Sequence, residues 1–350
     1  MDSLLFVGGT HLKNEYGMTI NEIKNFGHKI NGTFDYLLNN DEPLSLSKSM
    51  AKETSQLAEI FNNFNFNIIC VLGDRYELIP IILNAVLYRK PIIHLFGGEN
   101  TKGVIDEQIR HMVTKASHLH FVSNKLYAEN LKNLGEESFR IHNTGVLSAD
   151  AIINRNIIEK GLLFNDLKFD ETIKTILINY HPVTLDYGIS PIEQLENIFN
   201  ALENFEFQIV VTGPNAETGR DKIFGYYSNY IKENKKIKYI ESLGSDKFYN
   251  LISYCEFVIG NSSSGITDVP FFKLPSINIG DRQKGRIRHK SVIDCGYEIE
   301  EIIKAVNKSL SDSFRKTLVN MKYKLGDGKS AEKMVEIIKS ISLDQEFIRK

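Results

Sequence analysis

Short runs of β-branched and apolar residues alternate along the chain with longer stretches in which apolar residues recur at helical spacing. In the first part of the chain, five such runs predict strands: Leu4–Val7, Ile68–Leu72, Pro91–Phe96, Leu119–Ser123 and Phe139–Asn143. Four helical patterns lie between them: Ser45–Phe61, Glu77–Tyr88, Asp106–Lys115 and Lys125–Leu134. This order is typical of a parallel sheet with helices on both faces.

The alternation stops over Ile153–Glu171, which is polar and mixed and is interpreted as a linker, and then restarts. Further strands are predicted at Thr175–Tyr180, Phe207–Thr212, Lys236–Ile240, Phe257–Gly260 and Ser276–Ile279. Further helices are predicted near Pro191–Glu203, Asp221–Lys232, Asp246–Tyr254 and Gly265–Phe272, with two or three more between Glu298 and Ile348.

The pattern therefore predicts an α/β protein with two doubly wound, Rossmann-like domains that face each other across a cleft. The expected division is an N-terminal domain over 1–155, a C-terminal domain over 170–325 and a C-terminal helix over 326–350. In open parallel sheets, ligands bind at the carboxyl ends of the strands, so we expect the functional site in this cleft.

Composition narrows the classes of partner. The 350 residues carry 42 Lys and Arg against 44 Asp and Glu, a net charge of -2, which favours neither nucleic acid nor an anionic membrane as a partner. No apolar run approaches the roughly 20 residues that span a bilayer, and the first residues lack the pattern of a signal peptide. The cysteines Cys70, Cys255 and Cys295 have no metal-binding spacing. We therefore expect a cytoplasmic protein with free thiols and no bound metal.

Charged residues follow the strand that ends at Leu72, in the order Gly73, Asp74, Arg75, Tyr76 and Glu77. Glycine permits a tight turn, and an acid and a base at the end of a strand are typical of a functional site. Helix capping by Asp74 beside a surface Arg75 explains the pattern equally well.

A second cluster begins with His94 and continues through the paired glycines Gly97 and Gly98 to Glu99. The glycines indicate a close approach of the backbone to a ligand. Asp106 then opens a helix, where a carboxylate is stabilised by the helix dipole. Two simpler interpretations remain: Asp106 pairs with Arg110 one helical turn later, and His94 is a core histidine.

The second half of the chain has its own candidates. His181 precedes a proline, which favours an extended backbone. Ser262, Ser263, Ser264 and Gly265 lie between a strand and a helix, where hydroxyls and backbone N–H groups form an anion cradle. Simple capping by one serine is the alternative.

Positive charge is dense after the next strand, at Arg282, Lys284, Arg286 and Arg288. Arginine matches phosphate oxygens in a bidentate manner, so a phosphate ligand would explain this loop, as would a solvated surface loop. Carboxylates in one half and a phosphate cradle in the other indicate an enzyme acting on a nucleotide or sugar nucleotide.

Taken in order, these strings resemble the hydrolysing UDP-N-acetylglucosamine 2-epimerases of sialic-acid-type sugar pathways. The resemblance rests on these segments: residues 8–12 (GGTHL), 73–77 (GDRYE), 97–99 (GGE), 109–111 (IRH), 181–184 (HPVT), 260–265 (GNSSSG) and 280–286 (GDRQKGR). It implies a glycosyltransferase-B-like fold, no metal or nicotinamide cofactor, a UDP-sugar substrate and a homodimer or homotetramer. It also implies that a base removes the C2 proton while UDP leaves C1, after which the 2-acetamidoglucal is hydrated to N-acetylmannosamine.

Carried over residue by residue, the resemblance assigns roles to most of the candidates. Asp74 and Asp106 match acidic residues of the family's active site, and His181 matches a histidine of the C2 chemistry or the leaving phosphate. The substrate-binding set is Arg75, Ser262, Ser263, Ser264, Gly265, Asp268, Arg282 and Arg286, in which Asp268 stands where relatives have a glutamate that holds the ribose.

Two further departures from the family pattern matter. Many relatives have a glutamate two residues before the paired glycines, where this chain has Phe96, and we expect Glu99 to compensate as a catalytic carboxylate. Family members also usually begin with a strand and an arginine-containing turn, which this sequence does not contain. Either the true start lies upstream, or a truncated first sheet lacks a central strand and we expect weak or absent activity.

The resemblance leaves alternatives open. The same reaction on UDP-2,4-diacetamido-2,4,6-trideoxyglucose is the nearest, followed by a catalytically impaired UDP-sugar-binding protein. A glycosyltransferase of the same fold would need an acceptor. The non-hydrolysing epimerases usually carry His-Arg-Arg-Glu-Asn where this chain has His181 and the three residues after it.

Overall fold

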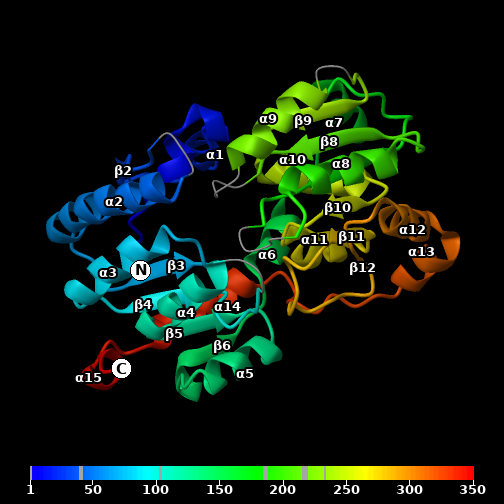
Figure 1. The fold of residues 1–350 in the computed structure, drawn as a ribbon. Coiled ribbons are helices and arrows are strands. Elements are labelled where there is room, and N and C mark those ends of the chain that lie inside the picture. The colour runs from blue at the N-terminus through cyan, green and yellow to red at the C-terminus, as the bar shows by residue number, and fades with distance from the viewer. Residues whose placement is uncertain (1, 39–41, 102–104, 184–187, 215–219, 232–233) are drawn as a thin grey trace. The chain divides into compact units, whose positions relative to one another are not determined.

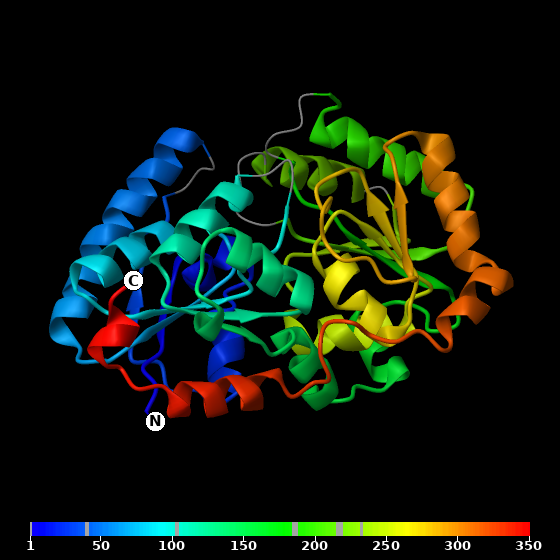
Figure 2. The same cartoon turned by 90° about the horizontal axis from the view of Figure 1, so that it is seen from below.

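The structure is a computed structural model and describes residues 2–38, 42–101, 105–183, 188–214, 220–231 and 234–350. Within it the chain forms two compact units. Unit 1 comprises residues 1–100, 105–150 and 325–350, and unit 2 comprises residues 151–324. The last 26 residues therefore return to the unit in which the chain begins, and in Figure 2 the C-terminal segment, drawn in red, lies along unit 1.

Unit 1 has two parallel sheets and helices around them (Figure 1). Its strands are β1 Phe6–Gly8, β2 Gly32–Phe34, β3 Ile69–Leu72, β4 Ile92–Leu95, β5 Leu119–Val122 and β6 Ile141–Asn143. Its helices are α1 Ile20–Asn25, α2 Pro43–Asn63, α3 Leu78–Leu87, α4 Asp106–Ala116, α5 Lys125–Asn133, α14 Ser330–Ser340 and α15 Gln345–Ile348. Helix α6, Leu147–Asn154, leads from unit 1 into unit 2.

The sheet of unit 1 is divided, which is a departure from the single doubly wound sheet that the pattern predicts. β1 pairs with β2, whereas β3, β4, β5 and β6 form a separate four-stranded sheet in that order. β3 pairs only with β4 among the described strands and so forms an edge of this sheet. Cys70 and Leu72, whose side chains share one face of β3, are exposed. By contrast, every residue of β4 and β5 is buried.

Unit 2 has one six-stranded parallel sheet in the order β12-β11-β10-β7-β8-β9. Its strands are β7 Thr175–Asn179, β8 Gln208–Thr212, β9 Ile237–Ile240, β10 Val258–Gly260, β11 Ser276–Ile279 and β12 Val292–Cys295. Its helices are α7 Lys160–Asp166, α8 Pro191–Leu202, α9 Arg220–Tyr230, α10 Gly244–Tyr254, α11 Ser264–Thr267, α12 Ile299–Leu310 and α13 Asp312–Leu318.

The two faces of this sheet carry separate cores, as the alternation of side chains along a strand requires. On β7, Ile176 and Ile178 join a cluster with residues of α8, α9 and α12, whereas Leu177 joins a cluster with residues of α7 and α10. Strands buried on both faces read as continuous apolar runs, which is why the sequence predicts β7 and β8 well.

Three predictions about local structure were wrong. The segment interpreted as a linker contains α7, whose Leu163 and Phe164 are buried in the core of unit 2. Strands β2 and β12 were missed, since the first has only three residues and the second carries an exposed Asp294. The region from Glu298 to Ile348 holds four helices rather than two or three. No helix among the described residues is long and apolar enough to cross a membrane.

Candidate functional site

In unit 1, the turn after β3 presents Asp74 to a buried arginine. Gly73 has a φ of 86°, which glycine adopts without strain, and the chain turns there. Asp74 Oδ2 then accepts a hydrogen bond from Nη2 of Arg110 on α4. The capping interpretation of Asp74 does not hold, because the residue that caps α3 is Glu77. Arg75 instead pairs with Glu77, with 2.9 Å between Arg75 Nη2 and Glu77 Oε1.

Arg110 is the centre of this cluster, and its side chain has no exposed surface. Its Nη1 donates to Glu107 Oε2 at 2.5 Å and to the backbone oxygen of Glu99 at 2.8 Å. Burial lowers the pKa of Arg110, but the nearby carboxylates of Asp74 and Glu99 outweigh it, so the pKa lies above its ordinary value. The guanidinium is therefore a permanent charge that joins the turn after β3, the loop after β4 and helix α4.

The loop after β4 is tightly constrained. Phe96 has a φ of 66°, which is rare for a bulky residue and marks a strained backbone. A side chain on Gly98 would lie 2.4 Å from the backbone oxygen of Tyr127, so only glycine fits there. Asn130 Nδ2 donates to the backbone oxygen of Gly98 at 2.8 Å. The loop leads to Glu99, which is only 8% exposed.

The expected alternative pairing on α4 is not what the structure holds. Asp106 is the first residue of α4 and is half-buried, and Arg110 bonds to Glu107 and Asp74 rather than to Asp106. The four acidic residues of this cluster come from three segments of unit 1: Asp74, Glu99, and the pair Asp106 and Glu107 on α4. The first two and Glu107 bond to the guanidinium of Arg110, Glu99 through its backbone oxygen.

In unit 2, the segment after β7 is held by one amide side chain. Asn261 Oδ1 accepts from the backbone N–H of His181 at 2.7 Å, and Asn261 Nδ2 donates to the backbone oxygen of His181 at 2.8 Å. A side chain on Gly260 would lie 2.0 Å from the backbone oxygen of Asn179, so β10 passes β7 at a distance that only glycine permits. His181 is consequently buried in a defined position, and Thr184 of the same string lies outside the described residues.

Hydroxyl groups of the serine segment bond to one another and to the end of β7. Ser262 Oγ accepts from the backbone N–H of Ser264 at 3.4 Å and from Ser264 Oγ at 3.1 Å, and Asn179 Nδ2 donates to Ser264 Oγ at 3.2 Å. A cavity of about 10 Å³, room for one water molecule, lies beside Asn179, Ser262, Gly265 and Asn278. Ser263 precedes α11 without capping it through its side chain.

The cationic loop after β11 divides into inward and outward members. Lys284 pairs with Asp281 and Arg288 pairs with Asp294, all at or near the surface. Arg282 is 6% exposed, and its Nη1 donates to the backbone oxygen of Asn261 at 3.3 Å. Gln283 donates to the same oxygen, and Arg286 is half-buried. Arg282 is thus the cation of this loop that contacts the residue before the serine segment. Asp268 is half-buried and accepts from Thr267 Oγ1.

Several residues that build these clusters were not predicted as site residues. Arg110 was considered as a helical partner of Asp106 and within the string at residues 109–111, Asn261 appeared only within the string at residues 260–265, and Glu107 and Asn179 were assigned no role in a site. The one available signal was that Asn261 precedes three serines and Asn179 ends a strand. Among the described residues, no group of three or more His, Cys, Asp or Glu side chains has the geometry to hold a metal ion.

Comparison with known proteins identifies the family of the chain. Residues 1–339 match the family described as UDP-N-acetylglucosamine 2-epimerase. A Campylobacter jejuni protein named GDP/UDP-N,N'-diacetylbacillosamine 2-epimerase (hydrolyzing) is 39% identical over 310 residues, covering 88% of this chain and 79% of that protein. A Legionella pneumophila UDP-N,N'-diacetylbacillosamine 2-epimerase (hydrolyzing) is 30% identical over 350 residues, covering 100% of this chain and 91% of that protein.

The fold of this chain is also similar to that of solved structures. The structure of a Neisseria meningitidis UDP-GlcNAc 2-epimerase bound to UDP-GlcNAc aligns with a TM-score of 0.74 at 16% identity, covering 97% of this chain and 100% of that one. The shared fold is glycosyltransferase-B-like, as the resemblance implied. The family match over nearly the whole chain shows that this protein belongs to the UDP-N-acetylglucosamine 2-epimerase family.

Proposed function

We propose that this protein is a hydrolysing 2-epimerase of a nucleoside-diphosphate 2-acetamido sugar, with UDP-2,4-diacetamido-2,4,6-trideoxyglucose (UDP-N,N'-diacetylbacillosamine) as its preferred substrate. The observation that carries this proposal is the name shared by the Campylobacter and Legionella relatives, the second of which matches this chain over its full length. The relatives therefore favour the sugar that the sequence left as the alternative. UDP-N-acetylglucosamine is the second candidate, because the family is described by that substrate.

The proposed reaction has two stages that balance with one water molecule. A base takes the C2 proton, the C1–O bond breaks, and the nucleoside diphosphate leaves with the bonding electrons to give a glycal. Water then adds hydroxyl at C1 while a proton returns to the opposite face of C2. The products are the 2-epimeric free sugar and the nucleoside diphosphate.

We assign the proton transfers to Asp74, Asp106 and Glu99 of unit 1 and to His181 of unit 2. A C2 proton is a poor acid, so its removal needs a positioned base in a site that excludes water. Arg110 supports this assignment by holding the carboxyl group of Asp74 in place and by anchoring Glu99 through its backbone oxygen. A Glu99→Gln enzyme with an unchanged rate would remove Glu99 from the set.

We assign the nucleoside diphosphate to unit 2, on Ser262, Ser263, Ser264, Gly265, Arg282 and Arg286, with Asp268 at the ribose and Arg75 of unit 1 as a further cation. A departing diphosphate gains negative charge and needs cations and hydrogen-bond donors that are already in place. The inward position of Arg282 supports its place in this set. No cofactor is needed, and a homodimer or homotetramer stays a prediction.

The test offers the purified protein three substrates in deuterated water: UDP-N-acetylglucosamine, UDP-N,N'-diacetylbacillosamine and the GDP form of the latter. Proton NMR should show a free 2-epimer with deuterium at C2 and release of the nucleoside diphosphate, with the highest kcat/KM for the UDP-diacetamido sugar. A higher kcat/KM for UDP-N-acetylglucosamine would transfer the assignment to the second candidate. UDP binding without turnover of any of the three would leave a sugar-nucleotide-binding protein.

Aspartate variants then separate the two stages. Asp74→Asn and Asp106→Asn should each lower turnover at least a hundredfold, and a variant that impairs only hydration should release the glycal. Lys236→Ala is the control, since Lys236 forms an exposed pair with Glu206 on the surface of unit 2 and should leave the rate unchanged.

A further inference from the structure

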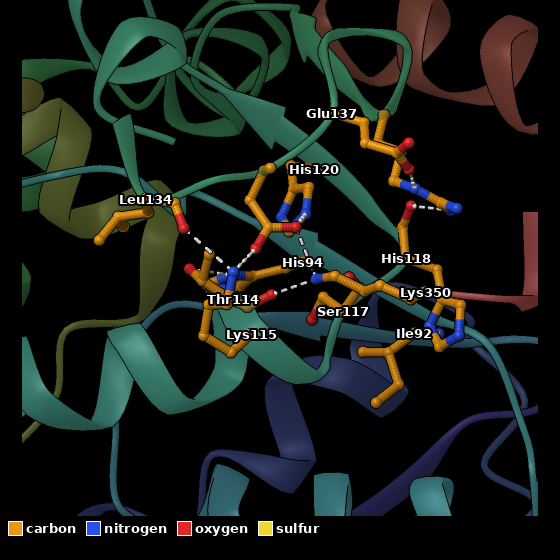
Figure 3. Close-up of polar contacts among 12 residues, drawn as sticks. Ile92, His94, Thr114, Lys115, Ser117, His118, His120, Leu134, Glu137 and Lys350 are labelled. Carbon is orange, nitrogen blue, oxygen red and sulfur yellow. Dashed lines mark hydrogen bonds and ion pairs between the residues drawn. The ribbon is translucent and has the colours of Figure 1, made fainter. Parts of the chain in front are cut away.

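His94 lies in β4, the strand before the loop that leads to Glu99, and has no exposed surface. Its side chain is among those labelled in Figure 3. Its Nε2 is 2.8 Å from the backbone oxygen of Gly73. A carbonyl oxygen can only accept a hydrogen bond, so Nε2 carries the hydrogen. On the other side of the ring, Nδ1 is 3.3 Å from Oγ1 of Thr114 on α4. The threonine hydroxyl therefore donates to Nδ1, and the ring is held as one neutral tautomer.

The protonation state agrees with these contacts. Burial lowers the pKa of His94 to about 4, so the ring is neutral near pH 7. A neutral imidazole has one donor and one acceptor nitrogen, and the direction of its hydrogen bonds is decided by its neighbours. With Thr114 as the donor at Nδ1, the hydrogen at Nε2 points at the turn that carries Asp74.

Three catalytic segments meet at this ring. Gly73 begins the turn that places Asp74 against Arg110. A side chain on Gly97 would lie 2.9 Å from His94 Nδ1 and 3.3 Å from Thr114 Oγ1, so the loop that leads to Glu99 passes directly over the ring. Thr114 lies on α4, one turn beyond Arg110.

The far end of α4 is also fixed, which makes Thr114 a firm support. Lys350 Nζ donates to the backbone oxygen of Thr114 at 2.9 Å, and also to Ser117. The same ammonium is 2.6 Å from Glu136 Oε2, which bonds to His120.

We propose that His94, held as its Nε2–H tautomer by Thr114, is a positioning residue that keeps the Gly73 turn, and with it Asp74, in the geometry needed for proton transfer. This inference rests on the proposed function, because it concerns the same reaction. The competing explanation is that His94 only fills space in the core. Under that explanation, the hydroxyl of Thr114 has no effect on turnover beyond its effect on stability.

Two substitutions at position 114 separate these explanations. Thr114→Val keeps the shape but removes the hydroxyl, so Nδ1 loses its donor and the ring is free to change tautomer or rotate. Thr114→Ser keeps the hydroxyl. We expect Thr114→Val to lower kcat about tenfold or more and to change KM by no more than about twofold, because small displacements of catalytic groups have large effects on rate. Thr114→Ser should retain at least half of the parent rate.

Ser117→Ala is the matched control. Ser117 is also fully buried near the same end of α4, and its hydroxyl donates to Val113 at 2.6 Å rather than to His94. It should lower the free energy of unfolding about as much as Thr114→Val and leave kcat unchanged. A Ser117→Ala enzyme that is as slow as Thr114→Val would overturn the proposal, since loss of stability alone would then explain both.

A spectroscopic measurement does not depend on turnover. In protein labelled with ¹⁵N histidine, His94 should show a protonated Nε2 and an unprotonated Nδ1 in the parent and in Thr114→Ser, and a different or mixed pattern in Thr114→Val. An unchanged His94 spectrum in Thr114→Val, or an Nδ1–H tautomer in the parent, would overturn the inference. Lack of turnover in the parent, with the predicted ¹⁵N pattern present, would instead count against the proposed function and leave the tautomer assignment standing.

Discussion

Replacing Arg110 with methionine removes the charge around which the acidic cluster of unit 1 is built. The guanidinium has no exposed surface, while the side chains of Asp74 and Glu107 are 21% and 26% exposed. After the substitution, both carboxylates lose the guanidinium to which they bond. Removal of one partner from a buried ion pair typically costs about 3 to 5 kcal/mol. Because water still reaches these two carboxylates, we expect the lower end of that range, about 3 kcal/mol.

The assay is urea unfolding followed by circular dichroism, with turnover measured in parallel. Arg75→Met is the matched control, since Arg75 forms a pair with Glu77 and is 35% exposed. Water reaches the Arg75 guanidinium but not that of Arg110, so Arg75→Met should lower the free energy of unfolding less than Arg110→Met does. We also expect Arg110→Met to abolish turnover, because Asp74 and the loop to Glu99 lose their anchor.

A double-mutant cycle with Asp74→Asn tests the reasoning itself. If the cost of Arg110→Met comes from the carboxylate left behind, it should be smaller in the Asp74→Asn background by about 1 kcal/mol or more. A cost for Arg110→Met no larger than that for Arg75→Met, or the same cost in both backgrounds, would refute the assignment of Arg110 as the centre of the cluster.

Three further outcomes are expected. Burial raises the pKa of Glu136, but hydrogen bonds from His120, Lys115 and Lys350 outweigh it and hold the pKa at about 2. Thermal melts should therefore show a contribution of Glu136 to stability that is present above about pH 4.5 and is lost as the pH falls toward 2. This contribution should be absent in Glu136→Gln. Arg282→Ala should weaken UDP binding at least tenfold in titration calorimetry, whereas substitution of the exposed Lys284 by alanine should change it less than twofold. Equal effects of the two substitutions would contradict the assignment of Arg282 to diphosphate binding. Asn261→Ala leaves the buried backbone N–H and oxygen of His181 without the Asn261 side chain as their partner. We expect the free energy of unfolding in urea to fall by about 1 to 3 kcal/mol and UDP binding to weaken. Parent-like values in both would contradict the role of Asn261 in holding this segment.

The local pattern of apolar residues was sufficient to predict a strand where the strand is buried on both faces of the sheet. β7 and β8 each hold a central run of apolar residues with every residue of the strand buried, and each was predicted to within one residue of its observed bounds. β2 and α7 were missed because their patterns are short or mixed, and their stability comes from contacts made elsewhere in the fold. Leu163 and Phe164 of α7 are apolar residues in a polar stretch, and only their packing in the core of unit 2 makes them structural.

The candidate site shows the same division. The order of the strings from residues 8–12 to 280–286 was enough to indicate the family, and comparison confirmed it. The partner of Asp74 was not predictable, because Arg110 is 36 residues away and meets it only when α4 packs beside the turn after β3. Likewise, Asn261 and His181 are 80 residues apart and are joined only because β10 pairs with β7.

By itself, the sequence determined the class of fold and most of its elements, since apolar periodicity and strand-end polar residues are properties of neighbouring positions. The tertiary structure alone decided which charges pair, which partners surround the His94 ring and which arginine of the cationic loop is buried. These depend on distances between residues far apart in the chain, and on burial, which makes an unpaired charge or a wrongly placed hydrogen costly.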